Sequence, residues 1–394
     1  MTRPTLEVAD IIRKAGDGFI ERNESHLAWP QLKVLRAIRD CRTAALGGHL
    51  DRCSRCGHQA ISYNSCRNRH CPKCQTSARE QWLAKQSRDL LPTPYFHVVF
   101  TLPHLLSGLA LQNKKTLYDL LFRATAETLT EVAADQRHLG ATIGFLSVLH
   151  TWGQNLQHHP HIHCVIPAGG LAPDGSRWIR APERFFLPVR VLSRVFRGKF
   201  VYGLKRLFRT HKLGFHGRLR NLAEPKSFRR FLRQLFRRDW VVYAKRPFGG
   251  PEHVLQYLAR YTHRVAISNH RLLAFEDGLV TFRWKDYAHG NRQRKMTLSA
   301  DEFLRRFLLH IVPRGFVRIR RFGFLANRSR AGLVPRCRQL LASTPSEPPP
   351  NAESCISHEW LCPVCAGPMI IIDRLTAEEL QRLSLNRRAP NDTS

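Results

Sequence analysis

The feature that most constrains this chain is a cluster of cysteines near its N-terminus, RCSRCGHQAISYNSCRNRHCPKCQ. Cys53 and Cys56 form one CxxC pair, and Cys71 and Cys74 form another, with 14 residues between the pairs. Each CxxC directs two thiolates at one tetrahedral ion, and two pairs at this separation are typical of a zinc ribbon. We therefore predict a structural Zn²⁺ held by these four cysteines, which supplies much of the folding free energy of a small module.

Other cysteines and histidines could add to this metal chemistry. Cys66 and His70 lie between the two pairs and could replace a ligand, start a second site or simply pack beside the ion. The C-terminal segment CISHEWLCPVC offers Cys355, His358 and the pair Cys362 and Cys365, either as a second zinc site or as a CxxC without a ligand. The total of 11 cysteines is odd, which in an intracellular chain favours metal over disulfides.

The charge of the chain indicates a polyanionic partner. Its 63 Lys and Arg against 30 Asp and Glu leave a formal net charge of +33. About half of the excess lies in residues 184–246, where 19 basic residues meet two acids. Apolar residues recur there at helical spacing, with Phe196, Phe200 and Leu204 on one predicted face and Phe228, Leu232 and Phe236 on another.

Two interpretations of this basic segment remain open. Its helices could be ordinary amphipathic helices with solvated faces, or a surface on which Arg229, Arg230 and Arg233 contact phosphates, and we favour the second. In a further basic cluster, residues 317–330, Phe322 and Phe324 stand between arginines. They are either stacking platforms for single-stranded nucleic acid or core aromatics.

The segment HPHIHCVIPAGG contains a His-hydrophobic-His triplet. On a strand, His161 and His163 point to the same face while Ile162 points to the other, which is a good start for a divalent metal site. Two histidines on a strand are often incidental, so the pattern alone is weak. A third ligand is needed, and Gln154, seven residues earlier, is the first candidate, followed by His253 and Gln256.

A second pattern, EHVLQYLARYTHR, adds to the first. Tyr257 and Tyr261 are four residues apart, so a helix places both hydroxyls on one face. The pair could be core aromatics, but the same stretch carries Arg260 and Arg264, which are typical of a phosphate-binding surface.

The order of predicted elements indicates an α+β fold. A strand is expected at 95–102, a helix at about 112–134, two strand-like runs before and through the His triplet, and a hairpin turning at Asp277-Gly278. We divide the chain into an N-terminal zinc module (1–90), a catalytic domain (91–335) and a Pro-rich linker with a CxxC tail (336–394).

Together, these blocks resemble a known family. The HxH strand followed by YxxxY is similar to two-tyrosine HUH nucleases, where U is a hydrophobic residue. Over residues 10–330 the chain resembles transposases of the insertion-sequence ninety-one family, through YNSCRNRHCPKCQ, FHVVFTLPH, LHTWGQNLQHHPHIHCVIPAGG and YLARYTHRVAISN. The resemblance implies an HUH endonuclease-like domain, with a central antiparallel sheet flanked by helices, after a helical zinc-ribbon module.

The resemblance also implies a mechanism. Tyr257 or Tyr261 attacks a DNA phosphodiester and forms a 5′-phosphotyrosine, while Mg²⁺ or Mn²⁺ on His161 and His163 polarises the phosphate. The expected partners are single-stranded and hairpin DNA at element ends, and target DNA. The alternatives are an HUH replication initiator or relaxase and, in another class, a non-catalytic zinc-dependent DNA-binding regulator.

Two expected absences complete the interpretation. No stretch approaches the roughly 18 apolar residues of a membrane helix, and the N-terminus lacks the apolar run of a secretory signal. We therefore expect no membrane partner and a cytoplasmic, nucleoid-associated protein of a bacterium. The sequence is silent on the oligomeric state.

Overall fold

The computed structural model describes residues 4–87, 89–182, 186–248, 266–286, 290–342 and 360–386. The chain divides into two compact units. The first contains Met1–Ala78, Ile267–Leu308 and Pro350–Ser394, and the second contains Arg79–Ala266 and Leu309–Pro349. This division differs from the predicted domains 1–90, 91–335 and 336–394, because the first unit collects three separate stretches of the chain.

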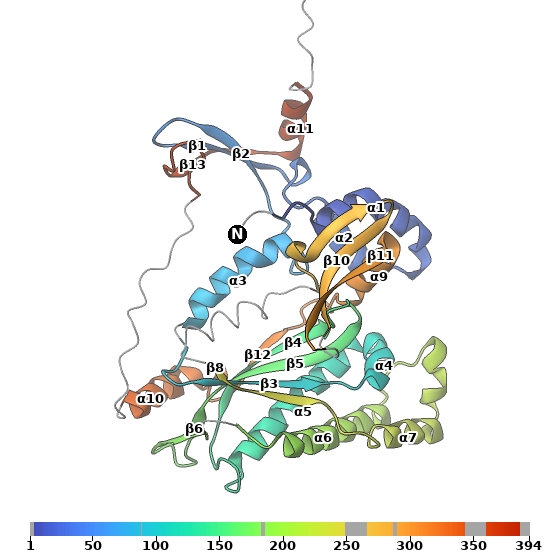
Figure 1. Ribbon diagram of the computed structural model, residues 1–394, viewed down its shortest axis with the longest axis vertical. Coiled ribbons are helices and arrows are strands. Elements are labelled where there is room, and N and C mark those ends of the chain that lie inside the picture. Colours follow the sequence, from blue (N-terminus) through green and yellow to red (C-terminus); the bar gives the residue numbers. More distant parts are fainter. Residues whose placement is uncertain are drawn as a thin grey trace, which may run out of the picture. The chain divides into compact units, whose positions relative to one another are not determined.

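The second unit is built on a five-stranded antiparallel sheet in the order β12-β4-β5-β3-β8 (Figure 1). Its strands are β3 (Tyr95–Thr101), β4 (Gly144–Trp152), β5 (His158–Pro167), β8 (Val242–Phe248) and β12 (Ile319–Gly323). A small two-stranded sheet of β6 (Gly169–Leu171) and β7 (Trp178–Arg180) follows β5. The predicted α+β class with a central antiparallel sheet is confirmed.

Helices cover one face of this sheet. They are α4 (Ser107–Gln112), α5 (Lys114–Ala134), α6 (Val189–Arg209) and α7 (Pro225–Gln234), with α5 and α6 crossing beneath the strands (Figure 1). Alternate residues of β3 and β5, such as Phe100 and Ile162, enter a large apolar core with α5 and α6. Gly203 lets α6 approach α5, because a Cβ there would lie 2.3 Å from Leu120.

The other residues of the same strands face the opposite side of the sheet. There Tyr95, Leu146, Val148 and Val165 form a small apolar cluster of their own. A third cluster packs Phe324 against α10 (Arg330–Ala342). Because β5 alternates between the two faces, this side of the sheet also receives the two histidines of the HxH triplet.

The first unit contains a zinc-ribbon-like sheet. Strands β1 (Gly48–Cys53) and β2 (Gln59–Tyr63) form a hairpin, and β13 (Met369–Leu375) pairs antiparallel with the free side of β1. The helix α11 (Ala377–Asn386) follows β13. The C-terminal region, which we predicted to be separate, therefore contributes the third strand of the N-terminal sheet, directly after its CxxC motif (Figure 1).

The rest of the first unit combines helices and a meander. Its elements are α1 (Val8–Arg22), α2 (Trp29–Arg39), β9 (Leu272–Glu276), β10 (Leu279–Asp286), β11 (Arg292–Ser299) and α9 (Ala300–Leu309), while α3 (Pro72–Ser87) crosses the division between the units. The predicted hairpin is confirmed: Glu276 pairs with Leu279, and Asp277 and Gly278 both have positive φ, as a two-residue type I′ turn requires.

The basic helices differ from prediction at one apolar position. Phe196, Phe200 and Leu204 are buried on α6, and Phe228 and Leu232 are buried on α7, as expected. Phe236, however, is half exposed, because α7 ends at Gln234 and the chain turns there. Phe231 occupies the core position instead, and the Arg197 guanidinium lies over the Phe236 ring.

Candidate functional site

Three histidines converge on the face of the second unit's sheet that lies opposite α5 and α6. His161 and His163 alternate with the buried Ile162 on β5, and His150 lies directly across from His161 on β4. Each imidazole offers a nitrogen within 4.8 Å of the other two. His150 and His163 are buried, and His161 is half buried. Three imidazoles gathered this closely could hold one divalent cation.

The histidines are held in the form that binds a metal. Burial lowers the pKa of His161 to about 4 and places the pKa of His163 well below its ordinary value, so both are neutral at physiological pH. The His161 Nδ1–H donates to the His159 carbonyl at 2.7 Å, which leaves the Nε2 lone pair for a ligand bond. His97 Nε2 lies 2.8 Å from His163 Nδ1, the outer partner that a metal-bound imidazole requires.

His150 was not predicted from the sequence, because its position depends on an irregularity in the strand register. Trp152 pairs with His158, so a regular hairpin would place residue 150 opposite Pro160, and a register shift between His150 and Trp152 brings His150 opposite His161 instead. His310 anchors the turn around residues 153–157, with its Nε2 2.9 Å from the Leu156 carbonyl. Gln154, the predicted third ligand, lies in the same turn, and its role as a ligand stays a prediction.

The tyrosine helix falls outside the described residues. Tyr257, Tyr261, Arg260 and Arg264, as well as the alternative ligands His253 and Gln256, lie in the undescribed range 249–265. Their predicted roles stay predictions.

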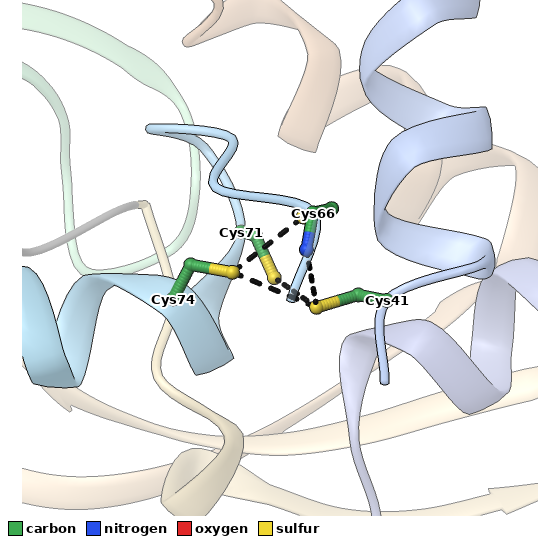
Figure 2. Close-up of side chains that lie close together, drawn as sticks. All are labelled: Cys41, Cys66, Cys71 and Cys74. Atoms are coloured by element: carbon green, nitrogen blue, oxygen red, sulfur yellow. Dashed lines mark hydrogen bonds between the residues drawn. The ribbon is translucent and has the colours of Figure 1, made fainter. Parts of the chain in front are cut away.

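In the first unit, four cysteines converge in a set that differs from the predicted one. Figure 2 shows the side chains of Cys41, Cys66, Cys71 and Cys74 close together, and their sulfur atoms lie within 4.8 Å of one another. The Sγ of Cys41 lies 3.6 Å from those of Cys71 and Cys74, and Cys66 Sγ lies 3.6 Å from Cys74 Sγ. Four sulfurs about 2.3 Å from one Zn²⁺ would be separated by about 3.8 Å, so the cluster has the dimensions of a tetrahedral zinc site.

The predicted grouping of Cys53 and Cys56 with Cys71 and Cys74 is therefore wrong. Cys41 precedes β1 and Cys66 follows β2, so both lie at the base of the hairpin, where Arg42 N donates to the Asn64 carbonyl. Cys53 lies at the far end of β1. At about 3.3 Å per residue, it is roughly 16 Å from Gly48, where the strand begins. There Cys53 and Cys56 meet Cys362 and Cys365 in a second four-cysteine cluster.

The remaining candidate ligands do not join either cluster. His70 is buried and its backbone N–H donates to Asn68 Oδ1, which fits the packing alternative rather than a ligand. Cys355 and His358 lie outside the described residues.

The basic segment is a strongly charged surface of the second unit. Arg229, Arg230 and Arg233 of α7 are exposed, and so are Arg237 and Arg238 beyond its end. On α6 the exposed basic residues are Arg190, Arg194, Lys205, Arg206 and Arg209. Of the less exposed cations, Arg197 pairs with Asp239 and Lys199 with Glu131. The apolar faces of these helices are used by the core, so their cations are directed to solvent.

In the second basic cluster, residues 317–330, several arginines form ion pairs within the unit. Arg320 pairs with Asp119, and Arg321 and Arg330 both pair with Asp89. Phe324 is buried, and Phe322 stacks on Phe145 at a ring separation of 5.2 Å. The core alternative therefore holds for these two aromatics, and stacking on nucleic acid is excluded for the buried Phe324.

Among the residues that the structure describes, none of the helices combines the length and the apolar character that crossing a membrane requires.

Comparison with known proteins agrees with these features. Residues 144–332 match a family of transposases, and residues 11–102 match a family described as the transposase zinc-binding domain. The chain is 56% identical over 384 residues to a protein of Sinorhizobium fredii named as the transposase y4qJ, covering 95% of this chain and 96% of that one. It is 29% identical over 376 residues to the transposase for insertion sequence element IS801 of Pseudomonas savastanoi pv. phaseolicola, covering 91% and 87%. The chain belongs to the insertion-sequence ninety-one family of transposases.

Proposed function

We propose that this transposase cleaves and rejoins single DNA strands at the ends of an insertion sequence through 5′-phosphotyrosine intermediates, in rolling-circle transposition. The observation that carries the proposal is the cluster of His150, His161 and His163 on the strands of a transposase. Three neutral imidazoles suit one divalent cation, and no other group of three or more metal-binding side chains is found in the described part of the second unit.

In this proposal His150, His161 and His163 would hold a divalent cation, Mg²⁺ or Mn²⁺, which when bound would supply Lewis-acid polarisation of the scissile phosphate. His97 would keep His163 in the metal-binding tautomer. Tyr257 and Tyr261 would be the nucleophiles. One hydroxyl attacks phosphorus, the O3′ leaves as a free 3′-OH, and the phosphotyrosine conserves the bond for rejoining. Two tyrosines allow two successive transfers.

The basic surface would bind the substrate. The exposed arginines of α6 and α7 can contact the phosphates of a single strand or hairpin, and Arg260 and Arg264 would contribute beside the tyrosines. The cluster of Cys41, Cys66, Cys71 and Cys74 would hold a structural Zn²⁺, because its sulfur separations fit a tetrahedron. We expect this zinc-containing unit to bind the element end.

The test uses an oligonucleotide that carries an element end, with Mg²⁺ or Mn²⁺. Wild-type protein should form a covalent protein–DNA adduct that survives denaturation and should join the bound strand to a target strand. Tyr257→Phe with Tyr261→Phe should abolish the adduct while DNA binding remains, because phenylalanine keeps the ring and removes the nucleophile.

Each single Phe variant serves as the matched control and should lose one of the two transfer steps. Cleavage by the double variant would show that the nucleophile lies elsewhere. If wild-type protein bound ends but formed no adduct on any of them, the regulator alternative would replace the enzyme. Cleavage without transfer of an element end to target DNA would favour a replication initiator or relaxase.

A further inference from the structure

The second cysteine cluster joins parts of the chain that are about 300 residues apart in sequence. It consists of two CxxC turns with the same backbone hydrogen bonds. In the first, the Cys53 N–H donates to the His58 carbonyl at 2.8 Å and the Gly57 N–H donates to the Cys53 carbonyl at 3.1 Å. In the second, the Cys362 N–H donates to the Gly367 carbonyl at 2.8 Å and the Ala366 N–H to the Cys362 carbonyl at 2.9 Å.

The repetition extends to the sulfur atoms and to the backbone angles. Arg55 N–H donates to Cys53 Sγ at 3.4 Å, and Val364 N–H donates to Cys362 Sγ at the same distance. The residue after each second cysteine has a positive φ, 74° at Gly57 and 54° at Ala366. Amides directed at sulfur stabilise a thiolate, which is the form of cysteine that binds a metal. Two matching turns that face each other have the form of a zinc ribbon.

The sulfur positions fit one ion. Cys53 Sγ lies 3.4 Å from Cys365 Sγ, and Cys56 Sγ lies 3.6 Å from Cys362 Sγ. These separations are close to the edge of about 3.8 Å of a tetrahedral Zn–S₄ site and far longer than a disulfide bond of about 2.05 Å.

The backbone at Gly367 lies close against the sulfur atoms. A Cβ on Gly367 would lie 3.1 Å from Cys53 Sγ and 3.2 Å from Cys365 Sγ. The Ser54 N–H donates to the Pro368 carbonyl, and β13 pairs with β1 from Cys53↔Met369 to Gly48↔Leu375. The cluster thus lies where the register between the two strands begins.

We propose that Cys53, Cys56, Cys362 and Cys365 bind a second structural Zn²⁺, separate from that of the Cys41 cluster, which fastens β13 onto β1. The N-terminal zinc-binding sheet is then complete only after the C-terminal segment has been made and has returned to it. The family match to the zinc-binding domain covers residues 11–102 and contains only half of this ligand set. The proposal does not depend on strand cleavage.

The test measures zinc per chain in the full-length protein by mass spectrometry of the metal, after dialysis against metal-free buffer. C53S/C56S and C362S/C365S should each lose one ion per chain. The quadruple variant should lose the same single ion and no more, because both pairs serve one site. Combining C362S/C365S with C41S/C71S should remove two ions. Cys365→His should keep both ions, because imidazole is also a zinc ligand.

Cys337→Ala is the matched control, since Cys337 is buried in an apolar cluster and belongs to neither cysteine set. It should retain all zinc. Cobalt substitution adds a readout beyond stoichiometry, because the tetrathiolate absorption should fall by about half in C362S/C365S.

Three results would overturn the proposal. They are a quadruple variant that loses one ion more than either serine pair does, a C362S/C365S variant that loses none, and disulfides between the two pairs in protein denatured without reductant. If a serine pair lost both ions by unfolding, Cys365→His decides: retention of two ions supports the site, and loss contradicts it.

Discussion

At the residue scale, the candidate catalytic site depends on three imidazoles that differ in how they are held. His161 has its tautomer set by the backbone carbonyl of His159, and His163 contacts His97. His150 enters only through its register opposite His161. Because none of the three residues of this cluster is a carboxylate, we expect Mn²⁺ to support activity at lower concentration than Mg²⁺.

We predict that His150→Ala lowers strand cleavage by at least about 100-fold, because a site with two imidazoles holds the cation poorly. Gel assays of cleavage with a Mn²⁺ titration measure this, and DNA binding should be unchanged. The exposed His26→Ala is the control. Gln154→Ala should have a smaller effect if Gln154 is not a ligand. Normal Mn²⁺ dependence in His150→Ala together with loss in Gln154→Ala would reverse the assignment.

At the scale of elements, α7 has one buried apolar face and one exposed basic face. Phe228, Phe231 and Leu232 belong to the core, while Arg229, Arg230 and Arg233 are exposed. Substituting the exposed arginines therefore changes charge without opening a cavity, which makes α7 a suitable element for testing electrostatic binding.

We predict that Arg229→Gln, Arg230→Gln and Arg233→Gln together weaken binding to single-stranded DNA and reduce its salt dependence. Loss of three phosphate contacts should lower the slope of log K against log salt by about 2. Fluorescence anisotropy at several salt concentrations measures it. The triple Arg→Lys variant keeps the charge and should keep most of the slope. A slope that is equal in the Gln variant and the wild type would make α7 an ordinary solvated helix.

At the scale of the whole molecule, each of the two units is stabilised internally in a different way. The second unit contains the largest apolar core of the described residues, built on one continuous sheet and its helices. The first unit is assembled from three chain segments and contains both four-cysteine clusters. Its stability should therefore depend on metal to a degree that the stability of the second unit does not.

We predict that a strong zinc chelator selectively unfolds the first unit. Hydrogen exchange followed by mass spectrometry should show loss of protection in β1, β2 and β13, while β4, β5 and α5 remain protected. Added Zn²⁺ should restore the lost protection, which separates metal loss from irreversible damage. Equal loss of protection in β4 and β5 would mean that the two units unfold as one.

Local patterns were sufficient for much of the fold. The alternation of β5, the helical spacing of α6 and the Asp277-Gly278 turn each depend on residues close in sequence, and each was predicted. Phe236 was misassigned because helical periodicity does not show where a helix ends. Phe322 and Phe324 were left open, since a sequence cannot show whether an aromatic ring packs inward or outward.

What the sequence determined by itself is the chemistry that is present: thiolate pairs, a His-hydrophobic-His strand, a tyrosine pair and a concentrated basic segment. Only the tertiary structure decided which of those groups share a site. Cys53 and Cys56 look like partners of Cys71 and Cys74 because they are near in sequence, yet a six-residue strand separates them. The turn before β13 supplies Cys362 and Cys365 instead. His150 joins His161 through strand register. Ligand identity is a property of residue type, whereas ligand grouping depends on distances that only chain folding creates.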